Sequence, residues 1–283
     1  GRNATSDHAL VDTVRGGSDS LASNTNAAER TDGAYGVTFN SNGFTSTGGN
    51  LNVNGREQVS WTFRKQPKFF DVVTYTGNGT AGRTISHNLG SVPGMIIIKC
   101  TNQTENWLVY HRGSNSSPED YYLELNSTGA ASSGSYWDNT LPTSTEFTIG
   151  GNSGPINQTT GTYVAYLFAH NNNDGGFGPD SEDIIKCGTF NSDGSGKGSV
   201  TLGFEPQFVM AKVASRTGNW NIFDTMRGYV NTSGNDDAWL EANTSDAESS
   251  YQWGNPTTTG FEFDGGYTSQ TYIYMAIRRP DQS

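Results

Sequence analysis

The chain repeats itself at a fixed distance, and this repeat limits the available folds more than any other feature of the sequence. Trp107 recurs as Trp220 and Pro93 recurs as Pro206, in each case 113 positions later. Unrelated segments would not hold one register across residues as different as tryptophan and proline. Self-similarity at a fixed period predicts several copies of one folded unit.

The repeat predicts three units, of which the first is incomplete. Two full copies span residues 66–170 and 176–283, whereas residues 1–65 match only the later half of a copy. The stretch VDTVRGG, from Val11, matches FDTMRGY, from Phe223, and QVSWTFRK at the end of the partial copy matches the last strand expected of the chain. We therefore expect two complete β-sandwich units preceded by the back half of a third.

Local patterns within each copy predict an all-β fold. Short segments, usually with alternating polar and apolar residues, are separated by Gly, Asn, Ser and Pro at the spacing typical of a sandwich or barrel. The segment TYVAYLFA, from Thr162, has apolar residues on both faces of a strand, so we expect both faces to be covered. Only 33% of the residues are hydrophobic, but 12% are aromatic and supply core material, so we expect order between the two ends.

Three stretches of the sequence together resemble a known module. They are DVVTYTGNGTAGRTISHNLGSVPGMIIIK, from Asp71, DTVRGG, from Asp12, and YIYMAIRRP, from Tyr272. They are similar to a repeat module of tail fibres and other virion structural proteins of bacteriophages, particularly those of marine bacteria, over nearly the whole chain. The resemblance implies tandem lectin-like β-sandwiches of the jelly-roll type on the virion surface, with other virion proteins as partners. It implies no known ligand and no active-site residues.

On this resemblance we expect a non-enzymatic virion structural protein, in a tail fibre, that contributes to recognition of a host-surface polysaccharide or protein. Two alternatives stay open, namely a capsid decoration or head-fibre protein and a polysaccharide-degrading tailspike. A glycan array and the location of the protein on the virion distinguish the first alternative from a fibre. Release of reducing ends from host capsule identifies the second.

The partial copy predicts a partner. Residues 1–65 lack the front half that would cover their strands, and a bare sheet exposes apolar surface and unpaired strand edges. The cover could be an upstream segment, another copy of the chain, or the neighbouring unit that begins at Phe70. We expect one of the first two, because the hairpin at Phe70 is needed by its own unit. This favours a homo-oligomer, with a trimer as the preferred state.

Charge and motifs argue against other classes of function. The net charge is −11 with only 17 lysines and arginines, so nucleic acid is not an expected partner, and no apolar run reaches the length of a bilayer span. The four histidines share no metal-binding spacing, so neither a metal nor a cofactor is expected. The carboxylate pairs Glu119–Asp120 and Asp236–Asp237 lie in turn-like runs and would cleave glycosides only if they met across a cleft. No catalytic residue is therefore assigned.

Aromatic residues supply the candidate contacts to a glycan or to a partner. Tyr122 and Trp239 occupy matched positions in the two full copies, and Trp137 and Trp253 lie in glycine-rich segments with Asn nearby. An exposed ring beside amide and hydroxyl groups can hold a sugar, but the same composition is found in subunit interfaces. Sugar contact, subunit contact and buried packing stay open for these four residues, and we expect Trp137 and Trp253 to serve in contact and not in folding.

Other recurring residues are expected to be structural. The repeated frame assigns four residues to the core: Trp107, Trp220, Pro93 and Pro206. The Asp-Thr-x-Arg-Gly turns that begin at Asp12 and Asp224 predict an ion pair or a side-chain cap that fixes each turn. Cys100 and Cys187 end apolar runs at positions that do not match between copies, which predicts two buried, unpaired thiols.

Overall fold

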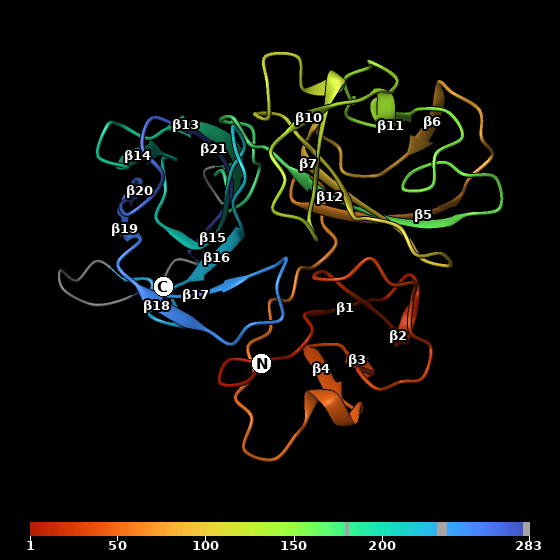
Figure 1. Cartoon of the computed structure of the whole chain (residues 1–283), viewed down its shortest axis with the longest axis horizontal. Coiled ribbons are helices and arrows are strands. Elements are labelled where there is room, and N and C mark those ends of the chain that lie inside the picture. The colour runs from red at the N-terminus through yellow and green to blue at the C-terminus, as the bar shows by residue number, and fades with distance from the viewer. Residues whose placement is uncertain (179–180, 231–236, 280–283) are drawn as a thin grey trace.

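The computed structural model describes residues 1–178, 181–230 and 237–279, and its sheets are antiparallel. About 41% of the residues lie in strands and the described residues include no α-helix, so the predicted all-β sandwich class is confirmed. Figure 1 shows three parts of the chain arranged around a common centre.

The N-terminal part, residues 1–65, contains two hairpins. Its elements are β1 (Ala9–Asp12), β2 (Gly16–Ala22), β3 (Val37–Asn40), β4 (Gly43–Ser46) and the short 3-10 helix η1 (Gly49–Leu51). The turn between β1 and β2 is fixed by the predicted ion pair, in which Arg15 Nε lies 2.6 Å from Asp12 Oδ2. The matching turn in the last part of the chain has the same pair, with Arg227 Nε 2.6 Å from Asp224 Oδ2.

The first sandwich extends from β5 to β12. Its six-stranded sheet has the order β10-β9-β8-β7-β12-β5, and a two-stranded sheet of β6 and β11 packs against it. The elements are β5 (Phe70–Thr76), β6 (Arg83–Ser86), β7 (Pro93–Cys100), β8 (Leu108–His111), η2 (Pro118–Asp120), β9 (Tyr121–Glu124), β10 (Ser132–Ser133), η3 (Ser135–Trp137), β11 (Glu146–Ile149) and β12 (Thr162–Ala169). The rings of Tyr75 and Phe147 join the two sheets in a T-shaped contact at 6.4 Å.

The second sandwich extends from β13 to β21 and has the corresponding strand order, β13-β21-β15-β16-β17-β18. Its smaller sheet has three strands, in the order β14-β20-β19. The elements are β13 (Ile185–Asn191), β14 (Gly198–Thr201), β15 (Pro206–Val213), β16 (Trp220–Asp224), β17 (Asp237–Glu241), β18 (Ser249–Tyr251), β19 (Gly254–Thr257), β20 (Gly260–Phe263) and β21 (Thr271–Arg278). Strand order does not fix where one unit ends, so the boundaries expected from the repeat stay predictions.

The central strands are covered on both faces, as their sequence predicts. Every residue of β7 is buried, and in β12 only Thr162 is not. One face of each large sheet packs against the smaller sheet of its own sandwich. The other face looks toward the centre, where Phe63 of the N-terminal part contacts Phe168 at 5.5 Å and Phe208 at 6.0 Å. All three parts of the chain therefore contribute to one central core, and the second sandwich has a further cluster of buried residues of its own.

The N-terminal part differs from expectation at its end. The strand predicted for QVSWTFRK, at residues 58–65, is absent, and Trp61 and Phe63 are held by ring contacts instead of a ladder. The reason is that the strands that flank β12 and β21 in the full copies, β5 with β7 and β13 with β15, have no counterpart in the partial copy. The same residues are covered by the two sandwiches of this chain. A second chain is not needed for that cover, and the homo-oligomer stays a prediction.

Matched hydrogen bonds join neighbouring parts around the centre. Trp107 Nε1 donates to the carbonyl oxygens of Ala22, at 3.0 Å, and Thr25, at 3.1 Å, and so links the first sandwich to the N-terminal part. Trp220 Nε1 donates to the carbonyl oxygen of Glu124, at 2.9 Å, and links the second sandwich to the first. These two tryptophans are therefore junction residues as well as core residues.

Two buried lysines strengthen the same junctions. Lys99 Nζ lies 3.3 Å from the carbonyl oxygen of Asn26, and Lys212 Nζ lies 3.1 Å from that of Thr128. Both side chains are fully buried, and burial lowers the pKa of each to about 8. Carbonyl groups of the neighbouring part thus replace the water that each ammonium group gives up.

The third junction closes the circle between the second sandwich and the N-terminal part. Ser6 N donates to the carbonyl oxygen of Ser245 at 2.9 Å, and Arg2 forms an ion pair with Glu248 at 2.9 Å. Trp61 Nε1 donates to Asp224 Oδ2 at 3.1 Å. Each part of the chain consequently contacts both of the others.

Candidate functional site

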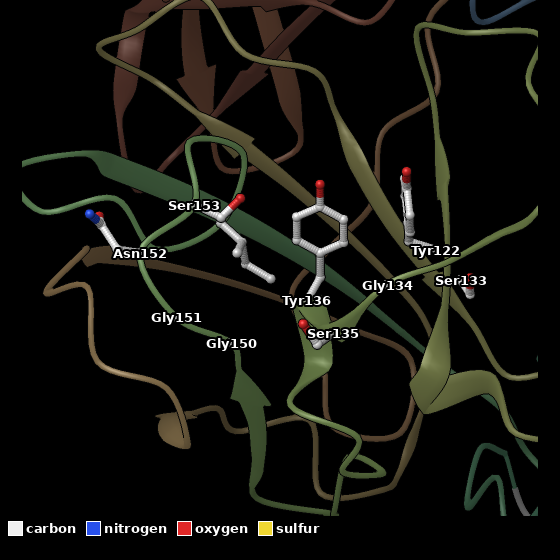
Figure 2. Close-up of a pocket in the computed structure, with 10 residues that line it drawn as sticks. Tyr122, Ser133, Gly134, Ser135, Tyr136, Gly150, Gly151, Asn152 and Ser153 are labelled. Atoms are coloured by element: carbon white, nitrogen blue, oxygen red, sulfur yellow. The ribbon is translucent and has the colours of Figure 1, made fainter.

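A groove of about 420 Å³ opens in the first sandwich. This volume lies within the range of roughly 300–1,000 Å³ that is usual for small-molecule sites. The groove is bounded by β9, by the segment from β10 into η3, and by the loop that follows β11 (Figure 2). Apart from three glycines and Ile156, its lining consists of Tyr122, Ser133, Ser135, Tyr136, Asn152 and Ser153.

Two local interactions shape the wall formed by η3. Trp137 is only 2% exposed, and its Nε1 donates to the carbonyl oxygen of Tyr121 at 2.9 Å, which anchors η3 on β9. Gly150 N donates to the carbonyl oxygen of Tyr136 at 2.7 Å. A Cβ atom at position 150 would lie 2.3 Å from the carbonyl oxygen of Ser135, so only glycine permits this close approach.

An aromatic pair forms the apolar part of the groove. The rings of Tyr122 and Tyr136 meet edge to face, with their centroids 4.7 Å apart and an interplanar angle of 78°. In Figure 2 both hydroxyl groups point to the same side, and Tyr136 stands between Tyr122 and Ser153. Burial raises the pKa of Tyr122, so its hydroxyl is neutral at physiological pH and can both donate and accept a hydrogen bond.

The polar part of the groove is uncharged. Hydroxyl groups come from Ser133, Ser135 and Ser153, and an amide comes from Asn152, whose Oδ1 accepts a hydrogen bond from Thr159 N at 3.0 Å. The lining residues include no Asp, Glu, His, Cys, Lys or Arg. The groove therefore offers ring surface and neutral hydrogen-bonding groups, and its lining has no carboxylate, imidazole, thiol or cationic side chain.

The four candidate contact residues occupy three kinds of position, namely in the groove, beneath it, and in the second sandwich. Tyr122 lies in the groove, as a contact residue should. Trp137 lies beneath the groove, and its burial corrects the expectation that it could touch a ligand directly. Its neighbour Tyr136, which the sequence analysis missed, takes that place because adjacent side chains in η3 point in different directions.

Trp239 and Trp253 lie in the second sandwich and not in the groove. Both are partly buried, and their rings meet in a T-shaped contact at 5.6 Å. Trp253 also packs against Phe263, at 5.5 Å, and Phe223, at 6.1 Å. The aromatic candidates therefore divide between the two sandwiches.

The residues expected in the core are buried. Trp107 is 0% exposed and Trp220 is 1% exposed, while Pro93 and Pro206 are buried at the starts of β7 and β15. Trp107 and Pro93 of the first sandwich occupy the same repeat positions as Trp220 and Pro206 of the second. Cys100 and Cys187 are also buried and unpaired. This was predicted because the two cysteines do not occupy equivalent positions in the two copies of the repeat.

The candidate catalytic carboxylates do not form a pair in the groove. Glu119 and Asp120 belong to η2 and are not among the lining residues. Asp237 is 2% exposed and accepts hydrogen bonds from the backbone N–H groups of Trp253, at 3.0 Å, and Gly254, at 3.2 Å. Its expected partner, Asp236, lies outside the described residues.

Residues 1–178, 181–230 and 237–279 contain no group of three or more His, Cys, Asp or Glu side chains placed to hold a metal ion. Within the same part of the chain, no helix has the length and hydrophobicity needed to span a membrane.

Comparison with known proteins identifies a family for the chain. No curated protein and no solved structure matches it. A family model described as a domain of unknown function, DUF7483, matches residues 1–279, which is nearly the whole chain, and the protein therefore belongs to that family.

Proposed function

We propose that this chain is a non-enzymatic structural protein of a bacteriophage virion, located in a tail fibre, and that its groove holds a sugar unit of a host-surface polysaccharide. The observation that carries the proposal is the pair Tyr122–Tyr136 beside a lining of uncharged hydroxyl and amide groups. The place in a tail fibre rests on the resemblance to virion repeat modules.

The chemistry of a sugar ring fits this lining. A pyranose presents C–H groups on its face and hydroxyl groups around its rim. The exposed parts of the two tyrosine rings provide apolar surface for the face, and Ser133, Ser135 and Asn152 provide donors and acceptors for the rim. Since the lining has no cation and the chain carries a net charge of −11, a neutral polysaccharide fits better than an acidic one.

The lining also favours binding over cleavage. Most glycosidases need two carboxyl groups on either side of the bond, about 5–10 Å apart. The groove has no carboxylate among its lining residues, and Asp237 is committed to backbone hydrogen bonds elsewhere.

A glycan array followed by calorimetry tests the proposal. We expect binding to neutral polysaccharides, and we expect Tyr136→Ala to weaken it at least tenfold, about 1.4 kcal/mol, because half of the aromatic pair is lost. Phe39→Ala is the matched control, since Phe39 is 40% exposed on the distant β3–β4 hairpin. Melting temperatures of both variants should stay close to that of the parent protein.

Two further measurements address the alternatives. Labelled protein located on virions separates a tail fibre from a capsid decoration or head-fibre protein. An assay for reducing ends, run on host capsule, detects a polysaccharide-degrading tailspike. Silence in the array together with labelling of the head would overturn the proposal, and so would release of reducing ends.

A further inference from the structure

The second sandwich repeats the aromatic pair of the groove with larger rings. Trp239 and Trp253 lie 117 positions after Tyr122 and Tyr136, respectively. The two pairs have the same T-shaped geometry, with interplanar angles of 78° in both, and centroid distances of 4.7 Å for the tyrosines and 5.6 Å for the tryptophans.

The backbone around the two pairs also corresponds. Tyr122 of β9 faces Ser132 of β10, and Trp239 of β17 faces Ser249 of β18. The hydrogen bond from Gly150 N to the carbonyl oxygen of Tyr136 has its counterpart in the bond from Asp264 N to that of Trp253, at 2.6 Å. The tryptophan pair therefore stands on the second sandwich where the groove stands on the first.

The difference between the two places lies in a third ring. Gly134 lines the groove in the first sandwich, whereas Tyr251 occupies the position 117 residues later, at the end of the edge strand β18. Tyr251 is 52% exposed, and its ring lies 6.0 Å from that of Trp253. It also lies over Gly265, where a Cβ atom would come within 2.6 Å of the Tyr251 ring. The second sandwich therefore has an exposed aromatic ring where the groove of the first has only a glycine.

Polar groups border this surface. Lys197 Nζ forms an ion pair with Asp264 Oδ2 at 2.6 Å, beside the loop under Tyr251. Rings bordered by such groups are suited to a sugar and not to a purely apolar ligand.

We propose that Trp239, Tyr251 and Trp253 form a second sugar-binding site, which stacks an internal ring of a neutral polysaccharide on the second sandwich. The proposal rests on the function proposed above, because it takes the same class of ligand. Since both sandwiches share one core, the two sites are held at a fixed separation, and a polymer that reaches both should bind more tightly than a short oligosaccharide.

Tryptophan fluorescence separates the second site from the first. The groove has no exposed indole, because Trp137 is 2% exposed, whereas the second site is built on two indoles next to Tyr251. The probes are laminarin, dextran and mannan, three neutral polysaccharides with different linkages. Fluorescence titration reports on the second site, and calorimetry with the same probes reports on total binding.

Three variants give distinct expected results with a polymer that binds. Tyr251→Ala should abolish the fluorescence response and lower affinity for the polymer about tenfold, while the groove still binds. Tyr136→Ala should keep the fluorescence response and lose the groove. Tyr267→Ala is the control, because Tyr267 is 44% exposed on the same sandwich, outside the three-ring site.

The outcomes distinguish the two proposals. Binding that Tyr136→Ala weakens, but that gives no fluorescence change and is insensitive to Tyr251→Ala, overturns the second site and leaves the proposed function standing. A fluorescence response lost only in Tyr251→Ala supports the second site even where the groove variant binds normally. Calorimetry without heat for all three probes overturns both.

Discussion

Replacing Trp107 by Phe should loosen the N-terminal part more than the equivalent change loosens the second sandwich. Trp107 Nε1 donates to two carbonyl oxygens across its junction, at Ala22 and Thr25, whereas Trp220 Nε1 donates to one, at Glu124. Both indoles are fully buried, so the cavity left by Trp→Phe is similar at the two positions. The comparison therefore isolates the additional carbonyl acceptor, because Trp107 shares its single N–H between two carbonyl oxygens.

The expected magnitudes follow from the cost of lost hydrogen bonds. Each carbonyl acceptor that is left without its donor costs about 1 kcal/mol, and each variant also loses about 1 kcal/mol from the smaller ring. Trp107→Phe should thus lower the free energy of unfolding by about 3 kcal/mol and Trp220→Phe by about 2 kcal/mol. Urea unfolding followed by circular dichroism measures both values under the same conditions.

Limited proteolysis tests where the loosening occurs. In Trp107→Phe, cleavage within residues 1–65 should become faster, because the lost bonds hold residues 22–25 against the first sandwich. In Trp220→Phe, the same cleavage should keep the rate of the parent protein. Equal loss of stability in the two variants, with unchanged cleavage of the N-terminal part, would refute the assignment of Trp107 as a junction residue.

Three more predictions concern buried polar groups. The free energy of unfolding should fall as the pH drops from 6.5 toward 4. Burial lowers the folded-state pKa to about 4 for three histidines, His8, His111 and His170. Between pH 6.5 and 4 the unfolded chain therefore binds protons at these histidines that the folded chain does not, and this favours unfolding. Melting temperatures across this range check it, and a flat profile would contradict it. Arg227→Ala should cost about 3–5 kcal/mol in urea unfolding, because Asp224 would keep a buried, uncompensated charge; a loss below about 1 kcal/mol would argue against a buried pair. Cys100 and Cys187 should react with a thiol reagent only after unfolding, because both are buried and burial raises the pKa of Cys187 to about 12. Rapid labelling of the native protein would contradict this.

The sequence allowed prediction of the fold class and of the core tryptophans, because both depend on local or repeated patterns. Alternation within short segments reports which face of a strand is covered, and a shared frame for Trp107 and Trp220 reports a shared packing role. The absence of a strand at residues 58–65 was not predictable in this way. A ladder needs partner strands, and the partners that β12 and β21 possess are missing from the partial copy.

The candidate site was only partly predictable. Tyr122 could be found because its strand position matches that of Trp239. The choice between Tyr136 and Trp137 depends on η3, a single turn without periodicity, and it was decided by the bond from Trp137 to a backbone carbonyl in β9. The groove itself also needs Gly150 close to Ser135, a long-range approach that no local pattern reports.

The contact between the first and last parts of the chain has a mechanical consequence. The N-terminal part contacts the second sandwich through Arg2 with Glu248, Ser6 with Ser245, and Trp61 with Asp224. A force that pulls the N-terminal part away from the second sandwich therefore loads this junction directly. The two parts cannot separate until these bonds break, so the junction acts as a clasp between them.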